Sequence, residues 1–397
     1  MVISDKIWDF VQEHRNSDVM KLLLSRQTLV GDELKVAVRQ IEGYQYALRK
    51  LPKWSKVERL VYPIHISLEQ CSSELTAQYK ASIIPEGKHL IDLTGGFGVD
   101  CFFLSQKFES STYVEQNTVL FEVVANNYKL LEMVQTTCVN ADSASFLKDT
   151  TPVDCIFIDP ARRGKGGGKL VSIADCEPNV IDLMPLLKEK TRYLFVKLSP
   201  MLDISKALSE LTHVTDIHIV SVDNECKELL LLFDFKTKEV FEPIIHCVNL
   251  RNGESQVGLS FYMSEERSVN ALQALELGNY LYEPNASVLK GGAFNLVAVK
   301  TETKKLHVNS HLYTSEELVA DFPGRSFRVV NTYQFDKKSI KKLKTAVQKA
   351  NIAIRNFPST VDTLRKKLQL QDGGDNYLFA TTLSDGQKIL IHCHKIS

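Results

Sequence analysis

The 397-residue sequence lacks any apolar run long enough to span a bilayer. Its first segment, MVISDKIWDFVQEHR, mixes charged and apolar residues and has no signal-peptide apolar stretch. We therefore expect a cytoplasmic protein with no membrane partner. The eight cysteines are scattered and contain no CxxC pair, which argues against a zinc ribbon or a disulfide framework. We interpret them mostly as buried small apolar residues.

The sequence also lacks net charge, because 48 basic residues balance 48 acidic ones. The balance is not uniform along the chain. From Pro323 to Leu370 there are twelve Lys or Arg residues and two acids, Asp336 and Asp362, which leaves a local net charge of +10. This asymmetry predicts a surface that faces a polyanion, with nucleic acid as the leading candidate. The alternative is a solvated helix face at 337–349 whose charge is balanced by acidic neighbours in the fold.

The chain is too long for one typical core, so we expect two or three domains. Residues 4 to about 50 have helical spacing, with Ser4 and Ser17 as candidate caps and Leu51-Pro52 ending the third helix. This predicts a helical appendix. Its expected apolar positions are Ile7, Phe10, Val11, Met20, Leu22, Leu23, Leu24, Leu34, Val36, Ile41 and Leu48.

From about Lys88 short apolar runs alternate with helical patterns, which is typical of βαβ units and a mostly parallel sheet. Two later runs, 216–222 and 227–235, are joined by a tight polar segment and predict an antiparallel pair at the sheet edge. The earlier candidate strands are 89–93, 111–115, 136–140, 154–159 and 192–198. The pattern predicts an α/β fold.

Beyond about Lys236 the alternation stops, and PIIHCVNL and QVGLSFYM predict short strands. The last segment offers FRVVNTYQF, a basic helix from about Lys337, a second helix near Val361, and the strands NYLFATTL and QKILIHCH. We interpret it as a compact α+β domain. The predicted domains are 1–68, 69–236, 237–322 and 323–397.

The strongest chemical signal is IDLTGGFGVD at 91–100, an apolar strand that ends in Asp92 and is followed by Gly95, Gly96 and Gly98. Glycines permit a sharp turn and a close approach of a ligand to the backbone. A dinucleotide site needs G-x-G-x-x-G, and Cys101 stands where the third glycine belongs, which disfavours a nicotinamide oxidoreductase. The run at 164–170 lacks the spacing and the Ser/Thr of a P-loop.

Three further acidic positions follow predicted strands. Glu115 would accept hydrogen bonds from ribose hydroxyls, and Asp142 would accept one from an adenine amine. Asp159 begins DPARRGKGGG directly after a strand, where the carboxyl ends of central strands form the ligand crevice. Arg162 and Arg163 are candidates to bind a substrate phosphate. Each acid alone would more often be a helix cap or a solvated group, so the order and spacing carry the prediction.

Together these motifs resemble class I S-adenosylmethionine-dependent methyltransferases across roughly residues 70–235. The resemblance implies a Rossmann-like seven-stranded sheet. It implies that the cofactor contacts Asp92, Thr94, Gly95, Gly96, Gly98, Glu115, Gln116 and Asp142. It also implies that Asp159 and Pro160 lie beside the transferred methyl group, with Arg162 as a further catalytic candidate.

At finer detail the segments QCSSELTAQYKASII, LIDLTGGFGVD, DPARR and VKLSPMLD resemble the THUMP-like-domain methyltransferases of Bacteroidetes over nearly the full chain. This resemblance implies an N-terminal helical region, a methyltransferase core, a small ferredoxin-like unit and a C-terminal THUMP-like domain. THUMP domains proper bind RNA in tRNA-modifying enzymes. The family resemblance and the basic segment therefore both favour an RNA acceptor, tRNA or rRNA.

Two departures bear on the chemistry. Ala161-Arg162 follow Asp159-Pro160 where amino-directed methyltransferases usually carry an aromatic residue that stacks on the base. The strand ending Lys197-Leu198-Ser199-Pro200 lacks the cysteine nucleophile of RNA uridine-C5 methyltransferases, and we interpret Cys226 as a packed thiol. We expect Asp159 to orient the acceptor atom, while Arg162, Arg163 and Lys197 hold a substrate phosphate.

Three alternatives stay open. The chain would be a non-catalytic RNA-binding protein that retains the cofactor fold, a methyltransferase for protein or small molecules, or, least favoured, an oxidoreductase. We expect no metal, since His392 and His394 share a strand face without a matching ligand set and are interpreted as exposed histidines.

Overall fold

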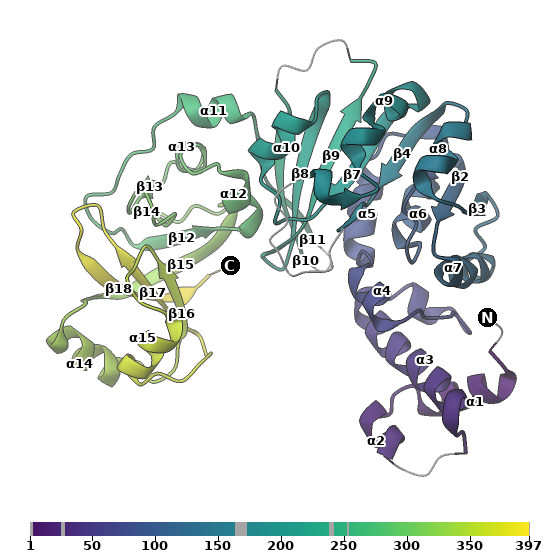
Figure 1. Ribbon diagram of the computed structural model, residues 1–397. Helices are drawn as coiled ribbons and strands as arrows, with labels where there is room; N and C mark the ends of the chain where they lie inside the picture. The colour runs from purple at the N-terminus through teal and green to yellow at the C-terminus, as the bar shows by residue number, and fades with distance from the viewer. Residues whose placement is uncertain (1–2, 25–27, 163–172, 238–241, 252–253, 397) are drawn as a thin grey trace. The chain divides into compact units, whose positions relative to one another are not determined.

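The computed structural model describes residues 3–24, 28–162, 173–237, 242–251 and 254–396 (Figure 1). The chain divides into two compact units. Unit 1 comprises residues 1–216 with 228–241, and unit 2 comprises 217–227 with 242–397. Among the described helices, none combines the length and the apolar character needed to cross a bilayer.

The first sheet has nine strands in the order β11-β10-β8-β9-β7-β4-β1-β2-β3, with parallel pairing from β7 to β3 and an antiparallel β7–β9 pair. The seven expected strands are all present, but the predicted count is wrong because β10 and β11 extend the edge. The strands are β1 Gly87–Asp92, β2 Phe108–Glu115, β3 Thr136–Asn140, β4 Val153–Ile158, β7 Thr191–Leu198, β8 Val214–Val222, β9 Glu225–Asp234, β10 Ile244–Arg251 and β11 Glu254–Phe261.

The alternation of strands and helices matches the predicted βαβ rhythm. The helices are α5 Glu74–Ile83, α6 Val99–Leu104, α7 Thr118–Leu130, α8 Ser143–Asp149, α9 Val180–Lys190 and α10 Ile204–Glu210. The predicted hairpin is β8–β9, and its two turn residues, Asp223 and Asn224, have left-handed φ angles of 49° and 66°. Asp and Asn tolerate that conformation better than most residues, which explains why the turn is this tight.

The N-terminal helices are α1 Asp5–His14, α2 Val19–Leu24, α3 Gly31–Lys50 and α4 His65–Gln70. Two predictions about this region were wrong. The side chain of Asp18, rather than that of Ser17, accepts the N–H groups at the start of α2. Of the apolar residues expected in that helix face only Leu22 is buried, while Met20, Leu23 and Leu24 are exposed.

These helices are not a separate appendix, because they share one hydrophobic core with α6 and α7. Trp54 is fully buried, and its ring meets that of Phe97 edge to face at 5.1 Å between centroids. The side chain of Asn127 exchanges two hydrogen bonds, of 2.9 and 2.8 Å, with the backbone of Val61. The N-terminal region therefore supports the glycine-rich segment that contains Phe97.

The second sheet has seven strands in the order β13-β14-β12-β15-β18-β17-β16. They are β12 Tyr280–Pro284, β13 Lys304–Lys305, β14 Tyr313–Ser315, β15 Gly324–Gln334, β16 Asn351–Arg355, β17 Asn376–Thr382 and β18 Lys388–Lys395. The predicted boundary at 322/323 falls between β14 and β15, yet β12 pairs with β15 in one antiparallel ladder. The later part of predicted domain 237–322 thus shares a sheet with predicted domain 323–397, while its earlier part, with β10 and β11, belongs to the first sheet.

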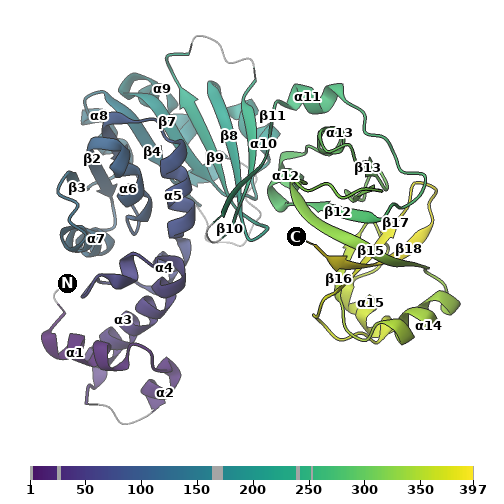
Figure 2. The same ribbon diagram turned by 180° about the vertical axis from the view of Figure 1, so that it is seen from behind.

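Five described helices follow β11 in the chain. They are α11 Met263–Ser268, α12 Ala286–Gly291, α13 Leu296–Lys300, α14 Lys337–Ala346 and α15 Val361–Leu368 (Figure 2). The apolar sides of α14 and α15 pack on Leu378 and Leu390, while the neighbouring residues Phe379 and Ile391 belong to a second core. Strand alternation therefore gives the sheet two buried faces.

The sequence predicted mostly buried cysteines and two exposed histidines, His392 and His394. All eight cysteines are free, and five of them are buried. His394 is exposed as expected, but His392 is buried, and both ring Nε2 atoms lie within hydrogen-bond distance of the Asn376 Oδ1 atom, at 3.2 and 2.8 Å. The expectation of an exposed His392 was wrong, because the ring lies beside the side chain of Asn376.

Candidate active site

The glycine-rich segment between β1 and α6 is pressed against two tyrosines. A Cβ atom on Gly95 would lie 2.1 Å from the ring of Tyr113, and one on Gly98, whose φ is +80°, would lie 2.6 Å from the Tyr128 hydroxyl. The phenols of Tyr113 and Tyr128 donate to the carbonyls of Gly96 and Gly98 at 2.6 and 2.7 Å. These contacts explain why two of the three glycines accept no side chain.

Gly96 differs from Gly95 and Gly98 because no neighbouring side chain among the described residues presses against its Cα atom. A Cβ atom there would meet nothing closer than the Thr94 carbonyl oxygen at 3.8 Å, although its φ of +55° still favours glycine. Its N–H donates to Glu115 at 2.9 Å, and the second carboxylate oxygen of Glu115 accepts the Asn117 N–H at 2.7 Å. A carboxylate has about four acceptor positions, so Glu115 retains capacity for a diol after holding the loop.

Asp92 ends β1 and is almost completely buried. One of its oxygens accepts the Thr94 N–H at 3.0 Å, while Oδ2 has no hydrogen-bond partner among the described residues. Burial, followed by the nearby charges of Asp100, Asp159 and Glu115, raises the pKa of Asp92 well above its usual range. A cationic group of a ligand would relieve both the missing hydrogen bond and the repulsion.

Thr94 joins the glycine-rich segment to the DPAR segment. Its hydroxyl oxygen accepts the backbone N–H of Asp159 at 2.6 Å. The Ser143 hydroxyl donates to the Leu93 carbonyl at 2.5 Å and brings the start of α8 to the same edge. The carboxyl ends of β1, β2, β3 and β4 therefore meet as the sequence predicted.

The Asp159 carboxylate is paired with the ammonium of Lys197, which lies 3.9 Å from Asp100 Oδ2 as well. Burial raises the pKa of Asp159 despite the opposing effect of Lys197. Burial alone would lower the pKa of Lys197, but the carboxylates of Asp159 and Asp100 raise it. Lys197 is therefore charged and engaged by carboxylates, and a role for it in holding a substrate phosphate stays a prediction.

Among the described residues, the remaining predicted site residues form no hydrogen bond or ion pair with Asp92, Gly96 or the Asp159 carboxylate. Pro160 is buried and Gln116 is exposed. Asp142 is exposed and caps α8 by accepting the Ser145 N–H at 2.9 Å, so its predicted contact with adenine stays a prediction. Arg162 lies in the short strand β5 (Ala161–Arg162), which pairs with β6 (Cys176–Glu177). Its side chain, Arg163 and the run at 164–170 lie outside the described part of the chain.

A charge cluster lies behind Asp159 and was not predicted from the sequence. Lys80 on α5 is fully buried and contacts Asp100 on α6 and Glu228 on β9. Lys80 and Asp100 both lie inside segments already singled out for their family resemblance, so their place in those segments was the available signal. No signal in the sequence pointed to the contact between Lys80 and Glu228, because 148 positions separate the two residues.

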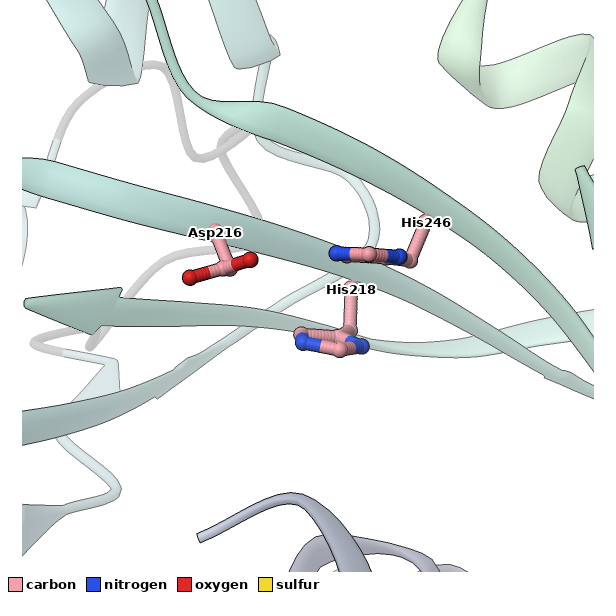
Figure 3. Close-up of side chains that lie close together, drawn as sticks. All are labelled: Asp216, His218 and His246. Carbon is pink, nitrogen blue, oxygen red and sulfur yellow. The ribbon is translucent and has the colours of Figure 1, made fainter. Parts of the chain in front are cut away.

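A second grouping missed in the sequence comprises Asp216 and His218 on β8 and His246 on β10, whose candidate donor atoms lie within 4.8 Å of one another (Figure 3). The two imidazole rings are stacked, with 4.4 Å between centroids and 14° between planes. Imidazole binds a metal through a lone pair in the ring plane, so parallel stacked rings do not aim at a common ion. This arrangement gives no support for a metal site.

A groove of about 670 Å³ lies elsewhere in unit 1, against His89, Ile91 and Thr112 of the first sheet and Phe146 of α8. None of the predicted cofactor residues lines it. The groove therefore does not compete with the edge formed by Asp92, Gly96, Glu115 and Asp159 as the candidate active site.

Comparisons with known proteins show the family of the chain. Residues 280–323 match a ferredoxin-like domain family and residues 324–395 a family described as THUMP domain-like. A solved structure from Porphyromonas gingivalis W83, provisionally assigned as a methyltransferase, is 34% identical, covers 100% of both chains and has a TM-score of 0.89. No curated protein matches closely enough to count as a relative.

Two partial matches are far weaker. The Escherichia coli protein YhhF, provisionally assigned as a methyltransferase, is 19% identical over 41% of this chain and 84% of its own, with a TM-score of 0.29. TrmK of M. capricolum, solved with S-adenosyl-homocysteine, is 12% identical over 41% and 68%, with a TM-score of 0.31. Scores this low carry no weight for function.

Proposed function

Because the chain belongs to the same family of class I methyltransferases as the Porphyromonas gingivalis protein, with a THUMP-like C-terminal domain, we propose that it transfers a methyl group from S-adenosylmethionine to RNA. One observation carries the proposal: the hydrogen bond from the Asp159 N–H to the Thr94 hydroxyl. It couples the segment expected to hold the cofactor to the residue expected to meet the acceptor.

The residues at the sheet edge fit S-adenosylmethionine. Asp92, with an unpartnered buried oxygen, would receive the cofactor ammonium, and the open side of Gly96 leaves room beside the backbone. Glu115 would accept the ribose hydroxyls in addition to the two N–H groups it already holds. When bound, the cofactor supplies an electrophilic methyl carbon on a sulfonium.

Asp159 performs the orienting step in this proposal. Its backbone is fixed by Thr94 and its carboxylate by Lys197, so the side chain is held while remaining about one-third exposed. The carboxylate would accept a hydrogen bond from the acceptor amine or hydroxyl and so turn the acceptor lone pair toward the methyl carbon. Alignment of this kind accounts for much of the rate of a displacement reaction.

An RNA acceptor is supported by the charge on α14. Lys337, Lys338, Lys341 and Lys342 are exposed, and none of them forms an ion pair with a described residue. Unpaired exposed lysines attract phosphate backbones. This basic surface, which we call the α14 surface, lies within the THUMP-like segment.

The test measures transfer of tritiated methyl from S-adenosylmethionine into separate total-RNA, protein and small-molecule extracts. Extracts come from cells that lack the gene, so that acceptor positions are unmodified. Wild-type protein is expected to label RNA. Asp159→Ala is expected to lose label about 100-fold or more while its cofactor affinity changes little.

The matched control is Asp149→Ala, which removes an exposed carboxylate of the same unit and should label RNA as the wild type does. Label in protein or in small molecules would reassign the acceptor. Cofactor binding without label in any extract would instead favour a non-catalytic RNA-binding protein. Equal labelling by Asp159→Ala and the wild type would contradict the role of Asp159.

A further inference from the structure

The charge cluster behind Asp159 is centred on a fully buried ammonium. Lys80 Nζ donates hydrogen bonds to Glu228 Oε2 at 2.6 Å and to Ser72 Oγ at 2.9 Å, and it forms an ion pair with Asp100 Oδ1, which lies 3.0 Å away. Two hydrogen bonds and two carboxylate charges therefore hold the buried ammonium of Lys80 in place. No ligand is needed to explain its charge.

Asp100 lies between the two lysines of the cluster. Its Oδ1 atom faces Lys80, while Oδ2 accepts the Ser72 hydroxyl at 2.7 Å and lies 3.9 Å from Lys197 Nζ. Burial pushes the pKa of Asp100 upward, but the charges of Lys80 and Lys197 outweigh it, so that the pKa is lowered. Asp100 is therefore an anion held mainly by Lys80.

Because Lys80 pairs with Asp100 and Glu228, Lys197 can pair with Asp159. Two cations, Lys80 and Lys197, serve three carboxylates, those of Asp100, Asp159 and Glu228. Without Lys80, Lys197 would be the remaining cation for all three. A buried carboxylate without a partner is strongly unfavourable, so Lys197 would be drawn from Asp159 toward Asp100.

We propose that Lys80 is a positioning residue of the methyl-transfer site: by neutralising Asp100 it leaves Lys197 free to hold the Asp159 carboxylate in its orienting position. This inference rests on the proposed function. It also gives a role to Ser72 and to the segment QCSSELTAQYKASII, whose sequence stood out without an assigned part in the chemistry.

The competing explanation is structural. Lys80 ties α5 to β9 through Glu228, and loss of that tie would disturb unit 1 without any specific effect on Asp159. The titratable groups around Asp159 are Lys197 on β7, Asp100 on α6, Lys80 on α5 and Asp92 on β1, and the charge of Lys80 itself lowers the pKa of Asp159. Its titration therefore separates the two explanations.

The experiment compares Lys80→Met, Glu228→Gln and the double variant Lys80→Met/Glu228→Gln with the wild type. The double variant keeps the net charge of the cluster and removes the buried carboxylate that Lys80 would otherwise leave alone. Asp159 is titrated by NMR of protein labelled with ¹³C at the aspartate carboxyl carbons, and Asp159→Asn identifies its signal. Methyl transfer to RNA is measured over the same pH range.

Both variants that lack Lys80 are expected to raise the titration midpoint of Asp159 by about one pH unit. The rising limb of the methyl-transfer rate should move to higher pH by the same amount, because Asp159 acts as its carboxylate. Glu228→Gln keeps the contact of Lys80 with Asp100 and should not raise the midpoint. A lower melting temperature with an unchanged midpoint would mark a structural effect alone.

A wild-type midpoint in the double variant would overturn the proposal, since Lys80 would then serve only to neutralise Glu228. If Lys80→Met alone does not fold, the double variant still gives this answer. If the wild type labels no acceptor, the proposed function fails, and the Asp159 midpoint still decides whether Lys80 controls that carboxylate.

Discussion

Two groups of lysines, one group in each unit, lie in opposite environments. In unit 1, Lys80 and Lys197 are buried or nearly so, and carboxylates surround them. In unit 2, the lysines of the α14 surface are exposed and form no ion pair with described residues. The same residue type therefore has two different physical roles in one chain.

The two groups of lysines differ in how strongly their charges interact with single neighbours and in how much water and salt screen those charges. A buried ammonium interacts strongly with the few groups that touch it, and its contribution depends on geometry. An exposed ammonium interacts weakly with any single neighbour, and salt screens it over roughly 10 Å. We propose that the buried lysines of unit 1 position side chains and that the lysines of the α14 surface bind a large polyanion.

The largest expected contrast is in stability. Lys80→Met leaves the buried carboxylates of Asp100 and Glu228 without their shared cation, and loss of one partner of a buried ion pair costs about 3–5 kcal/mol. Lys338→Met on α14 removes an exposed charge and should change the free energy of unfolding by less than about 0.5 kcal/mol. Urea unfolding of both variants measures the difference, and equal losses would break the comparison.

The second contrast is in the salt dependence of RNA binding. Replacing the lysines of the α14 surface by Gln should lower the slope of log affinity against log salt by about 3, because each phosphate contact to single-stranded RNA contributes about 0.7. At low salt the affinity should fall about tenfold or more. Filter binding over a range of salt concentrations measures both quantities.

The matched control for this variant replaces four exposed lysines of unit 1 by Gln and so removes the same total charge: Lys56, Lys129, Lys148 and Lys188. It should leave the slope close to that of the wild type. An equal loss of slope in both variants would mean that net charge, rather than the α14 surface, drives binding.

The parts of this comparison that the sequence predicts are the local ones. Strands β1 to β4 and the basic helix near Lys337 follow from apolar runs and charge patterns, which are set by neighbouring residues. The glycine loop was found because Gly95 and Gly98 leave no room for a Cβ atom, a constraint written in a short segment. The acids at the strand ends follow from the same segments.

Long-range pairing was missed. Nothing near β10 and β11 says that they extend the first sheet, because a strand run has the same period whichever sheet it joins. Lys80 was overlooked for a related reason: its partner Glu228 is distant in sequence, and a lysine in a helix is normally exposed. Asp142 shows that one residue can fit two local patterns, because the acid expected at the cofactor also caps a helix.

The smallest expected effect concerns the third charged environment, a buried acid with no cation. The pKa of Asp92 is raised in the folded protein by burial, so above pH ~4 the unfolded chain releases this proton more readily than the folded protein does. Stability from this group therefore falls as pH rises. Asp92→Asn cannot ionise, and its stability relative to the wild type should increase between pH 4 and pH 7.

The measurement is urea unfolding of Asp92→Asn and the wild type at several pH values, without cofactor and then with S-adenosylmethionine. The amide keeps an oxygen for the Thr94 N–H but offers no anion to an ammonium, so the cofactor should stabilise the variant less than the wild type. A gain in stability that does not change with pH would mean that Asp92 is ionised alike in the folded and unfolded chain. The raised pKa would then have no thermodynamic consequence, and the contrast between compensated and uncompensated buried charge in unit 1 would disappear.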